Sequence, residues 1–147
     1  MASRFLGPFE SLGMIVSICA NSNYRIWSIA DIKSFIVPAV NAGQCKIYFD
    51  GENWPIAFVT WALVNEEYHD ALLQEGANPP AKEWNSGANL WFMDIVAPPM
   101  LTLHIIRDMQ RNYFSNRHAH SIRRNPDGSV KRVQFWKNAL TGGLSSL

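Results

Sequence analysis

Hydrophobic positions in the first third of the chain recur at helical spacing. Apolar residues at every third or fourth position predict two helices, over 11–20 and 28–42. Ser11 is a candidate N-cap for the first helix. Pro38 falls inside the second and is expected to kink or divide it, because proline removes a backbone donor. Gly43 suits the end of this second helix.

Apolar and polar residues then alternate, a spacing that indicates strands. The elements predicted from this pattern and from turn residues are strands over 44–50 and 54–64, a helix over 66–75, a loop over 76–81, a strand over 90–97, a helix over 99–114 and strands over 118–124 and 130–136. Hairpin turns are expected at 50–53 and 125–128, each of which contains Asp-Gly. This order predicts an α+β fold with a mostly antiparallel central sheet flanked by helices.

The length and composition are those of a globular protein. A chain of 147 residues fits one domain with a real core, so we expect 1–147 to form a single domain with 1–10 and 139–147 frayed. With 48% hydrophobic and 17% charged residues, the chain is neither disordered nor membrane-spanning. A formal net charge of +1 gives no reason to expect a nucleic-acid partner. No apolar run approaches roughly 20 residues and no signal peptide is evident, which favours the cytoplasm.

Two cysteines and four histidines are the candidates for thiol or metal chemistry. Cys19 and Cys45 show neither the short spacing of a zinc site nor a disulfide framework, and both fall in apolar patterns typical of core thiols. His118 and His120 are two residues apart, which places both on one face of a strand. Because no other ligand accompanies them, no metal site is predicted.

The segment 84–98 carries an unusual charge. Asp94 is the single carboxylate in an apolar strand of Trp, Phe, Met, Ile and Val. Burying an unpaired carboxylate is costly, so Asp94 should be paired, solvated at an edge or used in chemistry. Two interpretations follow: Asp94 pairs with Arg25 or another arginine at a sheet edge, or it belongs to an active site.

The junction after this strand limits the chemistry. A strand followed by a helix at a sheet crossover is typical of GNAT-type acetyltransferases, in which backbone amides at the helix start hold the pyrophosphate of coenzyme A. Here Pro98 and Pro99 occupy the junction and remove two of those donors. An acyl donor would therefore present its thioester in another way.

Four segments resemble those of one enzyme family, in the same order and at compatible spacing. They are Leu12-Gly13 with Asn21, Ser22, Arg25 and Trp27; Pro55 to Phe58 with Trp61-Ala62; Trp84 to Pro98; and Ile122-Arg123 with the basic hairpin. Together they span 11–135, and they resemble the RTX toxin-activating lysine acyltransferases.

The resemblance implies a cytoplasmic enzyme with a GNAT-like fold. Such an enzyme transfers a fatty acyl group from acyl carrier protein to internal lysines of a toxin precursor. Its partners would be acyl carrier protein and the protein substrate, with acyl carrier protein as co-substrate and no other cofactor. Exposed apolar faces on the first helices also allow a homodimer.

Basic residues gather in the last third of the chain. They are Arg107, Arg111, Arg117, Arg123, Arg124, Lys131 and Arg132. They would suit an acidic acyl carrier protein, and a solvated basic surface is the alternative interpretation.

The resemblance breaks at one position. The family pairs a histidine, just before its Arg-x-Trp motif, with an aspartate on the third strand. Asp94 matches the aspartate, whereas Tyr24 stands at the position of the histidine. A tyrosine hydroxyl titrates near roughly pH 10, so it can donate a hydrogen bond but offers no neutral nitrogen as a base. Of the four histidines, which are His69, His104, His118 and His120, we expect His104 on the following helix to be the best-placed replacement.

The predicted site comprises catalytic and substrate-binding residues and no metal. The catalytic candidates are Asp94, Tyr24 and Ser22, and the substrate-binding candidates are Arg25, Arg123 and Trp91. Structural roles are the alternatives: Ser22 as a loop residue, Tyr24 as a packed ring, and Trp27, Trp61, Trp84 and Trp91 as core or turn anchors.

Two functions remain open at this point. The first is acyl transfer from acyl carrier protein to a lysine of a toxin-like protein. The second is a relative that has lost catalysis and binds acyl carrier protein or another protein. The tyrosine at position 24 is the feature that separates them.

Overall fold

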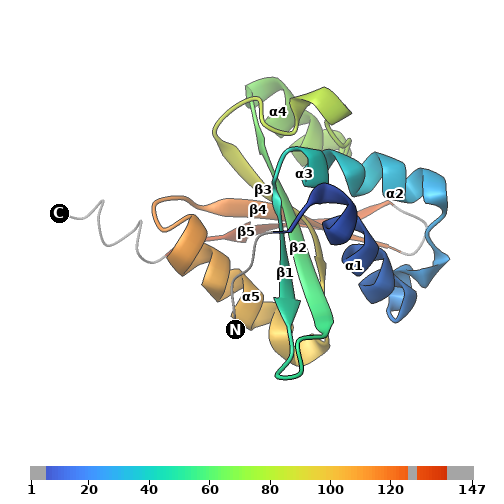
Figure 1. The fold of residues 1–147 in the computed structure, drawn as a ribbon. Coiled ribbons are helices and arrows are strands. Elements are labelled where there is room, and N and C mark those ends of the chain that lie inside the picture. Colours follow the sequence, from blue (N-terminus) through green and yellow to red (C-terminus); the bar gives the residue numbers. More distant parts are fainter. Residues whose placement is uncertain (1–5, 126–128, 139–147) are drawn as a thin grey trace.

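The computed structural model describes residues 6–125 and 129–138, which form helices on both sides of a single sheet (Figure 1). The helices and helical turns are α1 (Pro8–Ala20), η1 (Asn23–Ile26), α2 (Ile29–Phe35), α3 (Val37–Asn41), α4 (Glu66–Glu75), η2 (Ala81–Glu83), η3 (Pro99–Leu101), α5 (Thr102–Asp108) and the π-helical turn η4 (Met109–Tyr113). The strands are β1 (Cys45–Phe49), β2 (Pro55–Val64), β3 (Asn89–Val96), β4 (Ala119–Arg124) and β5 (Val130–Trp136). Within the described ranges, no helix has the length and apolar character needed to cross a membrane.

The five strands form one sheet in the order of the sequence. β1, β2 and β3 are successive antiparallel neighbours, β3 and β4 are parallel, and β4 and β5 are antiparallel again. The parallel pair needs a crossover, and α5 provides it. The predicted α+β fold with a mostly antiparallel sheet is therefore confirmed.

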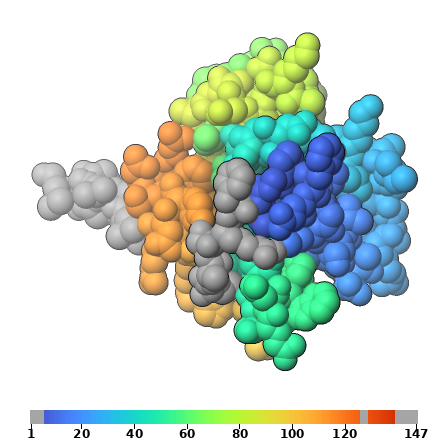
Figure 2. All heavy atoms as spheres, viewed as in Figure 1, coloured from blue at the N-terminus to red at the C-terminus, as the bar shows by residue number. Residues whose placement is uncertain are grey.

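The helices divide between the two faces of the sheet. Figures 1 and 2 show α1 and α2 on one side of the molecule and α5 on the other. Phe58 of β2 packs with residues of α1, while its neighbours Ala57 and Val59 pack with residues of α5. Alternate strand residues thus supply both cores. Each large apolar side chain that is fully buried contributes roughly 1.5–3 kcal/mol to stability.

The N-terminal helices differ from the prediction at their starts. α1 begins at Pro8, with Gly7 as N-cap, so the expected cap Ser11 lies inside the helix and is buried. The prediction that 1–10 is frayed is wrong for residues 8–10, because proline fits the first turn of a helix. The predicted helix over 28–42 is divided at Ile36, as expected from Pro38.

Some predictions concern residues outside the described ranges. The turn at 126–128 and the tail at 139–147 are among them. The assignment of 1–147 to a single domain stays a prediction. The prediction of core thiols is confirmed for Cys19, which is buried, whereas Cys45 is partly buried.

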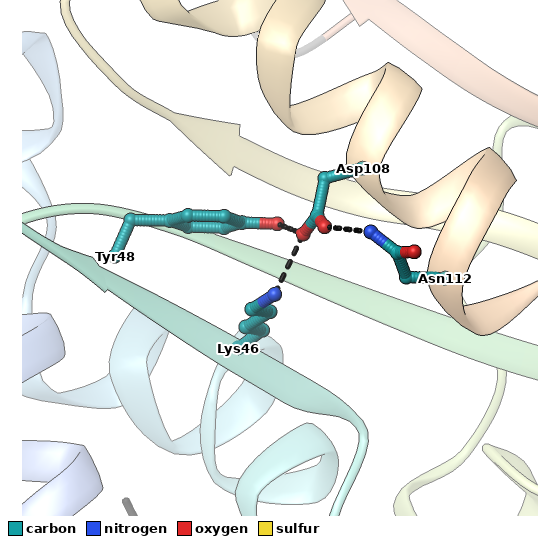
Figure 3. Close-up of polar contacts among 4 residues, drawn as sticks. All are labelled: Lys46, Tyr48, Asp108 and Asn112. Carbon is teal, nitrogen blue, oxygen red and sulfur yellow. Dashed lines mark hydrogen bonds and ion pairs between the residues drawn. The ribbon is translucent and has the colours of Figure 1, made fainter. Parts of the chain in front are cut away.

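A polar cluster ties the end of α5 to the edge strand β1 (Figure 3). The Asp108 carboxylate accepts hydrogen bonds from Lys46 Nζ and Tyr48 Oη, both at 2.6 Å, and from Asn112 Nδ2 at 2.7 Å. The Lys46 ammonium also lies 4.6 Å from the centre of the Tyr113 ring. Burial alone would raise the pKa of Asp108, but these hydrogen bonds lower it. The cluster fixes where the crossover helix ends.

The loop before β3 is held against the end of β2 by hydrogen bonds and close packing. Trp84 is buried, and its indole Nε1 donates a hydrogen bond to the Pro79 carbonyl at 3.2 Å. The backbone N–H groups of Ser86 and Gly87 both donate to the Leu63 carbonyl. Gly87 lies so close to the next segment that a Cβ there would come within 2.5 Å of the Asn65 Cα. The tryptophan and glycine that contribute to the family resemblance therefore build the sheet.

We predict opposite effects for two glycine-to-alanine substitutions. Gly87→Ala should lower the free energy of unfolding by about 1–3 kcal/mol, because the new methyl group meets backbone atoms that cannot easily move. Gly13→Ala, on an open helix surface, should raise it by about 0.5–1 kcal/mol. Urea unfolding of both variants measures the difference. Equal stability of the two variants would contradict the packing described at Gly87.

Candidate active site

The parallel strands β3 and β4 stay together over a short distance only. Their pairing consists of Trp91 with His120 and Phe92 with Ser121. No pairing joins the later residues of the two strands. Figure 1 shows β4 and β5 running behind β2 at a wide angle to it. The last residues of β3, Asp94 among them, are therefore paired on the β2 side only.

A β-bulge determines which way Asp94 faces. Opposite β2, Thr60 pairs with Asp94 and Trp61 pairs with Phe92, so Met93 is an extra residue in β3. The backbone N–H of Asp94 donates to the Thr60 hydroxyl at 3.1 Å. Val96, two residues farther on, packs with the α1 cluster, which places Asp94 on the same face as α1. Bulges commonly redirect a side chain in this way next to active sites.

The Asp94 carboxylate has no close polar partner in the described part of the chain. It accepts no hydrogen bond and forms no ion pair within 4 Å. Burial raises the pKa of this carboxyl to about 7, and the positive charge of Arg124 opposes the rise. Arg25 is exposed and forms no ion pair with Asp94, so a pairing with Arg25 is wrong; Arg124 is the other arginine, and its charge acts on Asp94. A carboxyl with this pKa is half ionised near neutral pH.

Tyr24 and Cys19 share the surroundings of Asp94. Burial raises the pKa of the Tyr24 hydroxyl, and the charge of Asp94 raises it further. The same two causes raise the pKa of the Cys19 thiol to about 11. Both groups therefore stay protonated at neutral pH. The structure thus places Tyr24 and Cys19 near enough to Asp94 for its charge to act on both, and a catalytic role for Tyr24 and Asp94 stays a prediction.

Ser22 holds the turn that presents Tyr24. Its hydroxyl accepts a hydrogen bond from the Tyr24 backbone N–H at 3.1 Å and donates one to the Cys19 carbonyl at 3.0 Å. It thereby caps η1. The Tyr24 ring is also packed edge-on against Trp27, with ring centres 4.7 Å apart. Ser22 acts as a positioning residue in this geometry, and a direct catalytic role for it stays a prediction.

The substrate-binding candidates lie in different places. Arg25 is exposed on the turn that carries Tyr24, and Arg123 is exposed on β4. Trp91 is wholly buried, and its Nε1 donates to His69 Nδ1 at 2.9 Å. The prediction that Trp91 contacts substrate is not supported, because the ring has no exposed surface; its alternative as a core anchor agrees with the structure. Arg25 and Arg123 remain candidates.

The histidine expected as a replacement base lies on the wrong face of the sheet. His104 is exposed on α5, which covers the face opposite to Asp94. The expectation that His104 is the best-placed replacement is therefore wrong. His120 stacks on Trp91, with ring centres 5.0 Å apart, and burial with the nearby His69 and His118 lowers its pKa. Among the residues that the structure describes, no three His, Cys, Asp or Glu side chains are grouped to hold a metal ion.

Three residues of the site were not identified from the sequence. Thr60, Cys19 and Arg124 interact with Asp94 only because distant segments pack together: Thr60 accepts a hydrogen bond from the Asp94 backbone N–H, and Cys19 and Arg124 interact with Asp94 electrostatically. Arg124 Nη2 also donates to the carbonyl of Gly76, the residue that follows α4, at 2.7 Å, and this hydrogen bond positions the guanidinium. Alternation along β4 could have indicated that Arg124 shares a face with Ile122 and His120.

A mostly antiparallel sheet in which a parallel strand pair diverges beside a crossover helix is consistent with a GNAT-like fold. Comparison with known proteins then gives the family. Residues 6–137 match the model of the RTX toxin acyltransferase family. The chain belongs to this family.

Individual relatives agree with the assignment. The chain is 30% identical to the RTX-I toxin-activating lysine-acyltransferase ApxIC of Actinobacillus pleuropneumoniae, over 89% of this chain and 76% of ApxIC. It is also 30% identical to an uncharacterized protein of Synechocystis sp., over 83% of this chain and 85% of that protein. The match to the protein-lysine myristoyltransferase HlyC of Escherichia coli, 30% identical, covers 62% of this chain and 52% of HlyC. By their names, ApxIC and HlyC are enzymes that acylate protein lysines.

We predict that removing the charge of Asp94 stabilises the protein. The pKa of Asp94 is about 7 in the folded state, above the unfolded value of 3.8. Ionisation of Asp94 therefore lowers the free energy of unfolding at every pH above about 4, and the full effect is present above pH 7. Asp94→Asn should raise the free energy of unfolding by roughly 2–4 kcal/mol at pH 8 and leave it unchanged below pH 4. Urea unfolding across this pH range measures the effect.

Asp108→Asn is the matched control, for which we expect a change in stability of the opposite sign. Because the pKa of Asp108 is lowered, its charged form stabilises the fold above pH 4, and this contribution is lost on acidification. The control should lose about 1–3 kcal/mol at pH 8, because Lys46 and Tyr48 lose their charged acceptor. Destabilisation by Asp94→Asn at pH 8 would show that the Asp94 carboxylate is held by favourable contacts, contrary to the site described.

Proposed function

We propose that this protein is a lysine acyltransferase that transfers a fatty acyl group from acyl carrier protein to a lysine of a toxin-like protein. The observation that carries the proposal is the partly buried Asp94, with a pKa of about 7, where β3 and β4 diverge. Family membership and the names of the relatives support the reaction class. No observation favours a protein that has lost catalysis.

Asp94 has the properties of the required base. A lysine side chain is protonated at neutral pH, with an ordinary pKa of about 10.4, and must lose a proton before it attacks. A carboxylate with a raised pKa is a better proton acceptor than an ordinary one. The neutral amine then forms a C–N bond to the thioester carbonyl, the C–S bond breaks, and the thiol leaves with a proton.

Tyr24 has the properties of a hydrogen-bond donor. Because its pKa is raised, the hydroxyl keeps its proton throughout the neutral range. Such a donor can stabilise the negative oxygen of the tetrahedral intermediate. Ser22 would contribute by holding the Tyr24 turn in place.

The properties of Cys19 argue for direct transfer to the lysine. An acyl-enzyme would need a thiolate, because the thiolate is the nucleophilic form of cysteine. Cys19 is 4% exposed and its pKa is raised to about 11, so its thiol stays protonated. Cys45 is partly buried, and its pKa is raised in the same direction by burial.

The donor and the location belong to the proposal as well. Pro98 and Pro99 leave few backbone donors for a coenzyme A pyrophosphate at the start of the crossover helix. An acyl carrier protein needs no such cradle, and exposed cations such as Arg25 and Arg123 suit its acidic surface. We propose no cofactor beyond this co-substrate, and a cytoplasmic location, where acyl carrier protein is found.

Acyl transfer tests the proposal directly. The purified protein is incubated with radiolabelled myristoyl acyl carrier protein and an RTX protoxin, with ApxIC as positive control. We expect a hydroxylamine-resistant amide on lysine, at a rate that rises as the pH passes through about 7 and Asp94 ionises. Asp94→Asn should lower the rate by roughly 10²–10⁴-fold. Tyr24→Phe, which keeps the packed ring, should lower it by about 10-fold or more.

Two results would contradict the proposal. The first is transfer by ApxIC and by Tyr24→His but not by the wild type, which would show that the protein has lost catalysis at position 24. The second is a pH profile and rate for Asp94→Asn equal to those of the wild type, which would exclude Asp94 as the base. Asp108→Asn serves as the carboxylate control on the other face of the sheet.

A further inference from the structure

The two edge strands of the sheet differ in their accessibility. In β1, Ile47, Tyr48 and Phe49 are buried, and Lys46 is engaged by Asp108. In β5, no residue is buried, and Phe135 is 57% exposed. Within the described residues, no strand pairs with the outer edge of β5. The backbone N–H and C=O groups along such an edge are ready to pair with another chain.

The part of β5 beyond its bulge is regular and lines a shallow groove. A bulge at Lys131 interrupts the pairing with β4, since Arg124 faces Val130 and Arg123 faces Arg132. Beyond it, residues 132–136 pair without interruption with 119–123. The same five residues of β5 line a shallow open groove. Five regular residues are the length of an ordinary strand.

The charges on the two strands β4 and β5 are of one sign. The strands carry Arg123, Arg124, Lys131 and Arg132 and no Asp or Glu, and the sequence between them contains Asp127. Arg123 and Arg132 lie directly opposite each other, an arrangement of like charges that destabilises a sheet. In the described part of the chain, neither has a carboxylate within 4 Å. An acidic partner would relieve this repulsion.

We propose that the outer edge of β5 binds an extended, acidic segment of a partner polypeptide by strand addition. Alternate residues of the added strand would face the two sides of the sheet. Acidic side chains would lie beside Arg132 and Gln134, and apolar side chains would lie beside Val133 and Phe135. The inference does not depend on acyl transfer, because it rests on the backbone edge of β5 and on Arg132, which lie outside the Asp94 site.

Cations on an edge strand also have a protective use. They discourage pairing between sheet edges, as a bulge does. Cations on β5 would keep neutral and basic segments from pairing with its free edge. They would not keep away an acidic segment, because its carboxylates are attracted to them. This difference in charge makes the proposal testable.

The probe is a fluorescein-labelled peptide of alternating Glu and Val, eight residues long. Its binding to the full-length protein is followed by fluorescence anisotropy, and amide protection of 132–136 is followed by hydrogen exchange. Two further peptides carry N-methyl groups, one on its odd residues and the other on its even residues. Each therefore lacks the backbone N–H donors along one of its two edges, while its charge is that of the parent peptide. We expect one N-methylated peptide to bind at least tenfold more weakly than the parent.

Variants of the protein separate the edge from general charge effects. Arg132→Glu should weaken binding of the parent peptide at least tenfold. Lys33→Glu, an equally large charge change at an exposed site on α2, should leave binding within twofold. Hydrogen exchange should show that the bound peptide protects amides of β5 and not those of β1.

Three results would overturn the proposal. Equal binding of the parent and of both N-methylated peptides would show that charge alone attracts them. Unchanged binding by Arg132→Glu would place the peptide elsewhere. A dimer in sedimentation, with β5 amides already protected in the absence of peptide, would show that a second copy of the chain occupies the edge.

Discussion

The organisation of the site depends on how briefly β3 and β4 pair. Two residue pairs join them, and α5 then has to carry the chain across the sheet. Because the strands separate after Phe92, the end of β3 is held from one side by β2 alone. That freedom accommodates the extra residue Met93, and the extra residue in turn directs Asp94 toward α1 and Tyr24. Without the divergence, the bulge would disrupt two ladders instead of one.

Two aspartates show what a protein does with a partly buried carboxylate. Asp108 has three hydrogen-bond donors and a lowered pKa, so its charge stabilises the fold. Asp94 has Thr60 beside its backbone, a distant cation and a raised pKa, so its charge opposes folding. Proteins tolerate such an unfavourable group where function requires it. The contrast makes Asp94, rather than Asp108, the candidate for the proposed base.

Much of the fold could be predicted from the sequence, because strand alternation and turn residues are local signals. The helix over 66–75 and the division of the second helix at Pro38 follow from such signals, and the structure confirms both. The direction of Asp94 could not be predicted, since strict alternation ignores a bulge. The neighbours Cys19 and Arg124 come from distant segments. His104 was misplaced because its position along the chain does not reveal which face α5 covers.

The loop at Trp84 and Gly87 shows that part of the resemblance to the family rests on structure rather than on chemistry. Its residues close the end of β2 and form no hydrogen bond with Asp94. These residues hold the start of β3 against β2, and the pairing of the two strands then carries the chain to Asp94. A different side chain at position 24 leaves this closure and this pairing in place. The scaffold that presents Asp94 is therefore built independently of the residue that faces it.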